Sequence, residues 1–341
     1  MTSIYQVVVL GANGHTGRFV VDALRRQEVI AIPATRTGRF TPIDGVEEDG
    51  RVLDFSRREA LDRTLAGANA VINCAGPFFD TAIPGAEAAL RAGIPYLDIA
   101  AEQRTALNLF EILDEKAKKA GVTILPAMAF YGGLADLLVS ALTPDGSAVD
   151  SIEIAMGLDS WHPTAGTRLT SEKNVYPRMI VRDGALAPIP DPAPAKRWTF
   201  PEPLGEQPVT CVALSEIILI SRHIRAKAIT SFMNLKPLDD LHHSTTPPPQ
   251  AIDARGRSAQ KFALEACVTA QGQTRHATAT GIDIYATSAP LIVKACLALL
   301  DGTHEAGVRA PGELFEAKAF LAGLSSEIAV EYRHSRPCHP G

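Results

Sequence analysis

The chain has 341 residues, 46% of them hydrophobic, so it can bury one large core or two moderate ones, and its length favours two domains. Its 33 basic and 38 acidic residues give a formal net charge of -5, without the positive excess that nucleic-acid phosphates require of a partner. The 5 cysteines are widely spaced and form no CxxC pair, which argues against a disulfide framework or structural zinc site and fits a reducing cytoplasm. They are Cys74, Cys211, Cys267, Cys296 and Cys338.

The first part of the chain, from residue 5 to about 140, alternates short β-rich runs with helical stretches. This alternation predicts βαβ units and a parallel sheet with right-handed crossovers. The opening apolar run is too short for a signal peptide or a membrane span, so we interpret it as a strand and expect no membrane span. Strands are expected in QVVVLG, VIAIPAT, RVLDF, NAVINCA, IPYLDIA and VTILPAM, and helices at 16–26, 57–65, 84–92 and 102–120.

Pro33 lies inside the second expected strand. In the usual strand order of a Rossmann sheet this strand is internal, where a residue without an amide hydrogen leaves a gap in the ladder. We therefore expect the strand to end near Ile32.

After about residue 145 longer strands and proline-rich loops predominate, with few clear helical stretches. FALEACVTA alternates apolar residues, and the short QGQ turn that follows predicts a hairpin with TRHATATGIDIY. The last stretches, SAPLIVKACLALLDG and PGELFEAKAFLAGL, return to helical periodicity, with Gly302 and Gly323 as stops. We predict an α/β fold, with a doubly wound Rossmann domain at 1–143, a mixed α+β domain at 144–285, and C-terminal helices at 286–341 that pack back on the first domain.

Three glycines, Gly11, Gly14 and Gly17, follow the first strand and open a helix. This context favours a dinucleotide site: a tight turn, close approach of the backbone to pyrophosphate, and tight packing of helix on strand. Free amides at the helix start, at the positive end of its dipole, bind the anion. His15, inside the turn, either flanks phosphate or faces solvent.

The end of the second strand indicates which nicotinamide cofactor is bound. An NAD site carries an acid about 20 residues after the turn, and none occurs between Val29 and Phe40. Instead this segment offers Arg36 and Arg39, with Thr35 and Thr37, and guanidinium is the planar cation that a 2′-phosphate favours. We therefore predict NADP(H), the alternative being a solvated surface arginine.

Two further strand ends belong to the expected crevice. Asp54 either approaches the adenine amine or caps the helix that starts near Ser56. In NCAGPF, Gly76 and Pro77 let the backbone lie against the nicotinamide half of the cofactor. Cys74 is interpreted as a small buried apolar residue.

Together these motifs resemble the saccharopine dehydrogenase-like oxidoreductases. The resemblance rests on GANGHTGR, NCAGPF, YLDIAAEQ, SEIILISRHI and GIDIYATSAP, in this order. It implies a Rossmann domain followed by a mixed domain for substrate and dimer contacts, with the C-terminal helices rejoining the first. Carried over by position, it assigns the dinucleotide turn to Gly11, Asn13, Gly14, Thr16 and Gly17, and the nicotinamide-side loop to Ala75, Gly76 and Pro77.

Hydride transfer needs little from a protein beyond orientation and a group that exchanges a proton. Asp98 is a candidate acid or base, or it holds a loop through backbone hydrogen bonds. Glu102 is a second candidate, or a first-turn acid favoured by the helix dipole. Tyr131 either donates a proton or packs at the domain junction.

In SEIILISRHI, Glu216, Arg222 and His223 either reach the crevice, where an arginine could orient a carboxylate, or form salt bridges on a strand. His242 and His243 lack metal-site spacing, and we predict no metal. No tyrosine precedes a lysine by four positions, and neither GxSxG nor HExxH occurs, which argues against short-chain dehydrogenase and hydrolase chemistry.

The sequence thus predicts an NADP(H)-dependent oxidoreductase acting on a small or lipid-like carbonyl, imine or enoyl substrate. Two alternatives stay open: a non-catalytic NADP(H)-binding sensor or scaffold, and an epimerase or lyase that keeps its cofactor tightly bound. A homodimer through the sheet of the second domain is expected.

Overall fold

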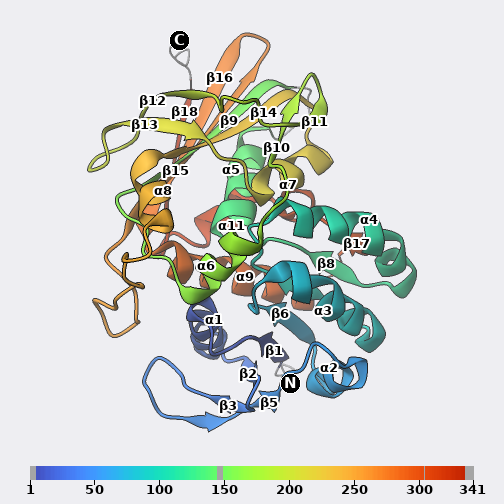
Figure 1. The fold of residues 1–341 in the computed structure, drawn as a ribbon. Helices are drawn as coiled ribbons and strands as arrows, with labels where there is room; N and C mark the ends of the chain where they lie inside the picture. The colour runs from blue at the N-terminus through green and yellow to red at the C-terminus, as the bar shows by residue number, and fades with distance from the viewer. Residues whose placement is uncertain (1–4, 144–148, 303, 335–341) are drawn as a thin grey trace.

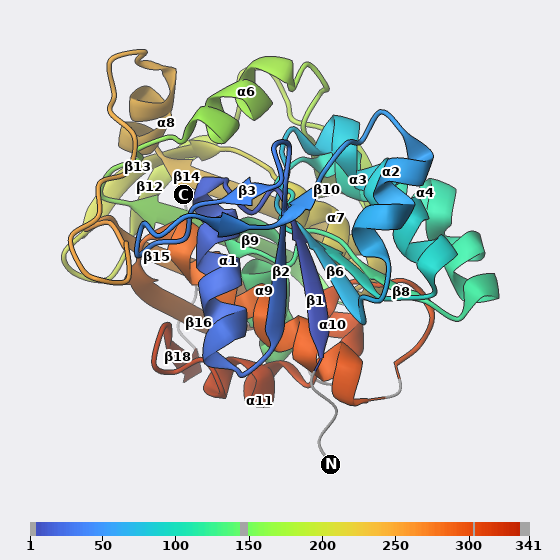
Figure 2. The same ribbon diagram turned by 90° about the horizontal axis from the view of Figure 1, so that it is seen from below.

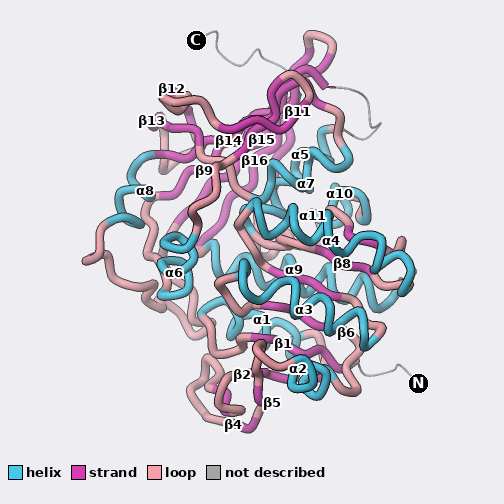
Figure 3. The backbone as a smooth tube through the Cα atoms, turned by 45° about the vertical axis from the view of Figure 1, so that its right-hand side comes forward, coloured by secondary structure: helices cyan, strands magenta, loops and turns pink. Residues whose placement is uncertain are grey.

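The computed structural model describes residues 5–143, 149–302 and 304–334, and Cys338 lies outside these ranges. Two sheets dominate the molecule, a seven-stranded one near the N-terminus of the chain and a nine-stranded one at the opposite end (Figure 1). Helices α5 (Ala135–Leu142) and α7 (Ser215–His223) lie between the two sheets (Figure 3).

All strands of the first sheet are parallel, as the βαβ pattern predicts, in the order β17-β8-β7-β6-β1-β2-β5. Strand β1 is apolar from Val7 to Leu10 and contributes to both faces of the sheet, since Val7 and Val9 enter one core cluster while Val8 and Leu10 enter the other. The strands are β1 (Gln6–Leu10), β2 (Ile30–Thr35), β5 (Arg51–Val52), β6 (Ala70–Asn73), β7 (Tyr96–Asp98), β8 (Thr123–Leu125) and β17 (Gly307–Val308), and a separate small pair is formed by β3 (Arg39–Phe40) and β4 (Glu48–Asp49).

Helices cover both faces of this sheet, which makes it doubly wound. On one face α1 (His15–Arg26) runs beside α9 (Ile284–Asp301), as Figure 2 shows. The other face carries α2 (Arg58–Leu65), α3 (Phe78–Ala92) and α4 (Gln103–Ala120). The predicted helices are present, but α3 begins six residues before Pro84, because Phe78, Thr81 and Ala82 already bury a helical face.

The expectation that the second strand ends near Ile32 is wrong. Strand β2 continues to Thr35, with Pro33 paired opposite Val9 of β1. The carbonyl of Thr35 accepts from Leu53, so odd-numbered residues here direct their backbone groups towards β5. That strand has only two residues and its pairing begins at Ala34, so no partner requires the amide hydrogen that Pro33 lacks.

The second sheet is mixed, as expected, because β9 and β14 pair in parallel while its other pairs are antiparallel. The predicted hairpin is confirmed and turns at Gln271 and Gly272. The strands are β9 (Val149–Leu158), β10 (Met179–Arg182), β11 (Ala185–Pro188), β12 (Ala195–Thr199), β13 (Glu206–Cys211), β14 (Ala226–Asn234), β15 (Lys261–Ala270), β16 (Gln273–Ile282) and β18 (Ala329–His334).

The second domain contains more helix than the sequence predicts. SEIILISRHI was expected as a strand and forms α7, because Ile217 through Ile220 are all buried between β14 and α4, and a helix buried on every side shows no period. Helices α6 (Ala165–Lys173) and α8 (Leu235–His242) lie in the polar stretches, and one π-helical turn (Phe130–Leu134) leads into α5.

The C-terminal part of the chain rejoins both sheets. Helix α9 packs on the first domain, and β17 pairs with β8, as the predicted return requires, whereas β18 pairs with β16 of the second sheet. The short helices α10 (Pro311–Leu314) and α11 (Ala317–Ala322) lie between them. By length and composition α9 is apolar enough to cross a membrane, but here it packs against α1.

Candidate functional site

A crevice of about 1290 Å³ lies at the carboxyl ends of β1, β2 and β6, where residues from both domains line it. The first domain contributes the glycine turn, the ends of β2 and β5, and the 74–78 loop. The second contributes α6, Trp161, Arg178 and Leu214, and the start of α9 adds Tyr285.

The glycine turn is shaped so that side chains would not fit. Gly11 has φ +74°, and a Cβ there would lie 2.7 Å from the Cα of Ala75. A Cβ on Gly17 would collide with the carbonyl oxygen of Gly11, so only glycine allows the helix to start this close to the strand end. Gly14 precedes α1 directly and Thr16 lies in its first turn, and both line the crevice. No described side chain caps α1, and the first amides of a helix have no partner within it.

Asn13 and His15 hold this turn in place. Asn13 Nδ2 donates to the carbonyl of Arg39 at 2.8 Å, and its Oδ1 accepts from the amide of Thr41 at 2.9 Å. The His15 ring makes edge-to-face contacts with the rings of Phe19 and Tyr285, and burial lowers the pKa of His15. It is therefore partly enclosed by aromatic rings instead of facing solvent, and its Nε2 has no hydrogen-bond partner among the described residues.

At the far end of the turn, Thr35, Arg36 and Thr37 line the crevice. Arg36 is exposed, and within the described part of the chain its guanidinium makes no hydrogen bond or ion pair. Arg39 differs, because it binds Glu47 and Asp49 and does not line the crevice. Of the two arginines, Arg36 is the one available to a phosphate.

Asp54 and the 74–77 loop form the next wall. Asp54 Oδ1 accepts from the amide and the hydroxyl of Ser56 at 2.9 and 2.6 Å, and these bonds lower its pKa. It therefore holds the turn before α2 and also lines the crevice. Ala75, Gly76 and Pro77 line it too, and the Ala75 amide donates to Asn73 Oδ1 at 2.9 Å. The thiol of Cys74 is buried, and burial raises its pKa.

Asp98 is fully buried and lies behind the crevice wall. Its Oδ1 accepts from the amides of Ala100 at 3.0 Å and Ala127 at 2.8 Å, and burial raises its pKa to about 6. These contacts hold together the loops after β7 and β8, which corresponds to the loop-holding alternative for this residue.

Glu102 lies in the crevice wall just before α4, and 2% of its surface is exposed. Its carboxyl accepts from the amides of Ala101 at 2.9 Å and Phe78 at 3.4 Å. Burial raises its pKa to about 7, so near neutral pH both protonation states are populated. Of the two acids in YLDIAAEQ, Glu102 is the one that lines the crevice.

Tyr131 faces the crevice from the π-helical turn. Its hydroxyl is buried without a hydrogen-bond partner in the described chain, and burial raises its pKa, so it stays protonated. Its ring centroid lies 5.9 Å from that of Trp161, whose Nε1 donates to the hydroxyl of Tyr285 at 2.9 Å. The tyrosine thus combines a packing position with a free polar atom.

Arg178 was not predicted from the sequence. It stands just before β10 and lines the crevice, and its guanidinium makes no ion pair or hydrogen bond with any described residue. Burial lowers its pKa, while the nearby Glu216 and Tyr131 raise it. Glu216 is itself fully buried, with a pKa raised to about 7 by burial. A half-buried guanidinium without a partner is a candidate anchor for an anion.

The other residues of SEIILISRHI lie elsewhere. The Arg222 guanidinium stacks over the Phe110 ring at 4.5 Å, and His223 Nε2 contacts Asp136 Oδ1 at 2.6 Å. Neither lines the crevice. His242 and His243 contact the backbone carbonyls of α8. No group of three or more potential metal ligands occurs among the described residues.

The first half of the crevice fits a dinucleotide phosphate. The turn has room for backbone-to-phosphate contact that a Cβ would fill, and α1 begins at the crevice wall, where the free amides of a helix start bind anions. Arg36 lines the far end, with no hydrogen-bond or ion-pair partner among the described residues.

Comparison with known proteins agrees with this geometry. Residues 7–125 match the family model described as the saccharopine dehydrogenase NADP binding domain. The match covers the N-terminal domain, and the resemblance indicated by the motifs is confirmed there.

Curated relatives share this part of the chain. A rat saccharopine dehydrogenase-like oxidoreductase is 29% identical over 157 residues, covering 39% of this chain and 36% of that protein. A Caenorhabditis elegans lipid droplet localized protein is 26% identical over 225 residues, covering 54% of this chain and 52% of that protein. The matches thus span about a third to a half of the relatives' own length.

Solved structures extend the likeness of fold to nearly the whole chain. Apo saccharopine dehydrogenase (L-Glu forming) from Saccharomyces cerevisiae has a TM-score of 0.64 at 13% identity, covering 96% of this chain and 100% of that one. The C. glutamicum DAP dehydrogenase in complex with DAP has a TM-score of 0.51 at 12% identity, covering 96% and 99%. The predicted fold class is confirmed.

Proposed function

We propose that this protein is an NADP(H)-dependent oxidoreductase whose substrate carries an anionic group. One observation carries the proposal: the crevice that begins at the glycine turn continues to Arg178, a half-buried cation with no partner among the described residues. When bound, NADP(H) supplies or accepts the hydride. A carbonyl, imine or enoyl compound is the matching substrate class.

The protein's own groups then have distinct tasks. Arg178 binds the anionic end of the substrate, since guanidinium pairs with carboxylate in two parallel hydrogen bonds. Glu102 exchanges the proton, because its carboxyl lines the crevice and has a pKa of about 7. Tyr131, protonated at neutral pH, donates a hydrogen bond to the reacting group. Trp161 and Phe130 exclude water and contact an apolar part of the substrate.

A substrate screen tests the proposal. NADPH absorbance is followed with 2-oxo acids with and without ammonia, then with aldehydes and enoyl acids of equal chain length. Turnover confined to compounds that bear an anion, and lost in Arg178→Ala, supports the proposal. The matched control is Arg182→Ala at the far end of β10, an exposed arginine outside the crevice.

A non-catalytic NADP(H) sensor is the second candidate, and an apolar mouth favours it. Leu169 lines the crevice from α6 and is 42% exposed, and α6 buries none of its residues. Tight NADPH binding with no turnover across the whole screen would select this candidate.

Two expectations about assembly and location accompany the proposal. We infer a homodimer through the second sheet and a cytoplasmic location. Sedimentation of the purified protein tests the first, and microscopy of the tagged full-length protein tests the second.

A further inference from the structure

A second cavity, of about 450 Å³, lies away from the crevice between α1, α9, the 255–257 loop and the segment before β18. Its volume is within the range of small-molecule sites. The two helices supply an apolar floor that includes Phe19, Ala289, Val293 and Leu297. It shares no lining residue with the crevice.

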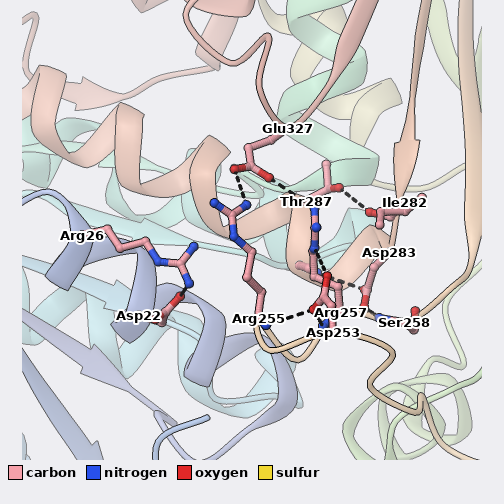
Figure 4. Close-up of polar contacts among 11 residues, drawn as sticks. Asp22, Arg26, Asp253, Arg255, Arg257, Ser258, Ile282, Asp283, Thr287 and Glu327 are labelled. Carbon is pink, nitrogen blue, oxygen red and sulfur yellow. Dashed lines mark hydrogen bonds and ion pairs between the residues drawn. The ribbon is translucent and has the colours of Figure 1, made fainter. Parts of the chain in front are cut away.

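The rim of this cavity is charged and has an excess of cations. Its charged side chains are Asp22, Arg26, Arg255, Arg257, Lys294 and Glu327, four positive against two negative. Figure 4 shows how most of them pair: Arg26 with Asp22 at 2.6 Å, and Arg255 with Glu327 at 2.9 Å. Arg257 binds Asp253 at 2.8 Å, so even with this third carboxylate one positive charge remains.

Lys294 carries the unbalanced charge. Among the described residues its ammonium has no hydrogen bond or carboxylate partner. It lies over the Phe320 ring, 5.0 Å from the centroid, and packs against Gly323. It is half-buried on α9, and burial lowers its pKa. A cation kept partly out of water without a counter-ion costs free energy that a bound anion offsets.

We propose that this cavity is a second binding site, for a small amphiphilic anion whose carboxylate or phosphate pairs with Lys294 and whose apolar chain lies between α1 and α9. The apolar floor and cationic rim fit opposite ends of such a molecule. Arg255 and Arg257 lie on the same rim and add positive potential without losing their own carboxylates.

Binding of decanoate, decyl phosphate and decanol to the protein without nucleotide, measured by calorimetry, tests the site. Both anions should bind at one site per chain, with decanol at least about tenfold weaker. Lys294→Gln should weaken the anions about tenfold. Lys318→Gln, a lysine over the Tyr332 ring outside the cavity, should leave binding unchanged. Ala23→Phe, which fills the cavity from α1, should abolish binding of all three ligands with the fold intact by circular dichroism.

The same titrations can overturn the proposal. Equal binding of decanol and decanoate, unaffected by Lys294→Gln, would show a merely apolar cavity. Displacement of the anion by NADPH would place it in the crevice, and no binding at millimolar decanoate would remove the site. Because none of these readouts requires turnover, they are independent of the proposed oxidoreductase activity.

Discussion

The two halves of the crevice differ in how they are built. The dinucleotide half is made by neighbours in sequence: Gly11, Gly14 and Gly17 form one strand-to-helix turn, and their fit depends on backbone shape. The substrate half is assembled from distant segments, with Tyr131, Arg178 and Tyr285 converging from three elements. The first half is thus fixed by local geometry. The second depends on long-range packing, and among the described residues it carries the unpaired hydroxyl of Tyr131 and the unpaired guanidinium of Arg178.

The largest effect is expected from Gly11→Ala. At φ +74° a side chain is strained, and its Cβ would collide with the backbone of Ala75. NADPH affinity should fall by at least about a hundredfold, together with a lower melting temperature. Gly272→Ala is the matched control, because it has φ +75° with open space around it and lies outside the crevice. Equal losses of NADPH affinity in the two variants would contradict a specific role for the turn.

Arg178→Ala tests the substrate half of the crevice. Loss of a half-buried guanidinium should lower kcat/KM for an anionic substrate by about a hundredfold, while NADPH affinity stays unchanged. Arg178→Lys should restore part of the loss. If the variant binds NADPH more weakly and KM is unchanged, the arginine belongs to the cofactor half.

The dinucleotide half of the crevice could be predicted from the sequence, whereas much of the substrate half could not. The glycine turn, Arg36 and the 74–77 loop were predicted because each is a short motif at a strand end. Arg178 could not be found in this way, since the groups that influence its charge, Tyr131 and Glu216, are tens of residues away in the sequence and no local pattern marks it. Helix α7 was predicted as a strand because its buried apolar run shows no helical period. Strand β17 was not predicted, because two residues are too few to show an alternating pattern. Pro33 was misjudged because the shortness of β5 was not visible.

Glu216→Gln tests the electrostatics of the substrate half. Burial raises the Glu216 pKa from an ordinary 4.5 to about 7, so the folded state holds the proton more tightly than the unfolded state. The contribution of the Glu216 carboxyl to the stability of the folded state is fully present below its pKa in the unfolded state. This contribution is lost as the pH rises through about 7, the pKa in the folded state. Between pH 5 and 8 the wild type should therefore lose up to about 3 kcal/mol of unfolding free energy that Glu216→Gln does not lose, measured by urea unfolding. If the unfolding free energies of wild type and variant change with pH in parallel, Glu216 does not have a raised pKa in the folded state.

The smallest effect is expected at His223, outside the crevice. Burial opposes its charge, but Asp136 outweighs this and raises the pKa of the imidazole. The stabilisation is present below the unfolded pKa and is lost as the pH rises through the folded value. His223→Gln should lower the free energy of unfolding by about 1 kcal/mol near pH 6 and by less near pH 9, measured by thermal unfolding. His242→Gln, at an exposed helix end, should leave the free energy of unfolding unchanged. A pH-independent cost at His223 would indicate packing alone.

The central claim is that this crevice is an NADP(H) site, and equilibrium titration by nicotinamide fluorescence tests it most directly. NADPH should bind more tightly than NADH, and Arg36→Ala should weaken NADPH binding about tenfold while leaving NADH binding unchanged, because NADH has no 2′-phosphate with which a guanidinium could pair. Arg39→Ala is the control, since that side chain already binds Glu47 and Asp49. Failure of both nucleotides to bind at high micromolar concentration would contradict the account.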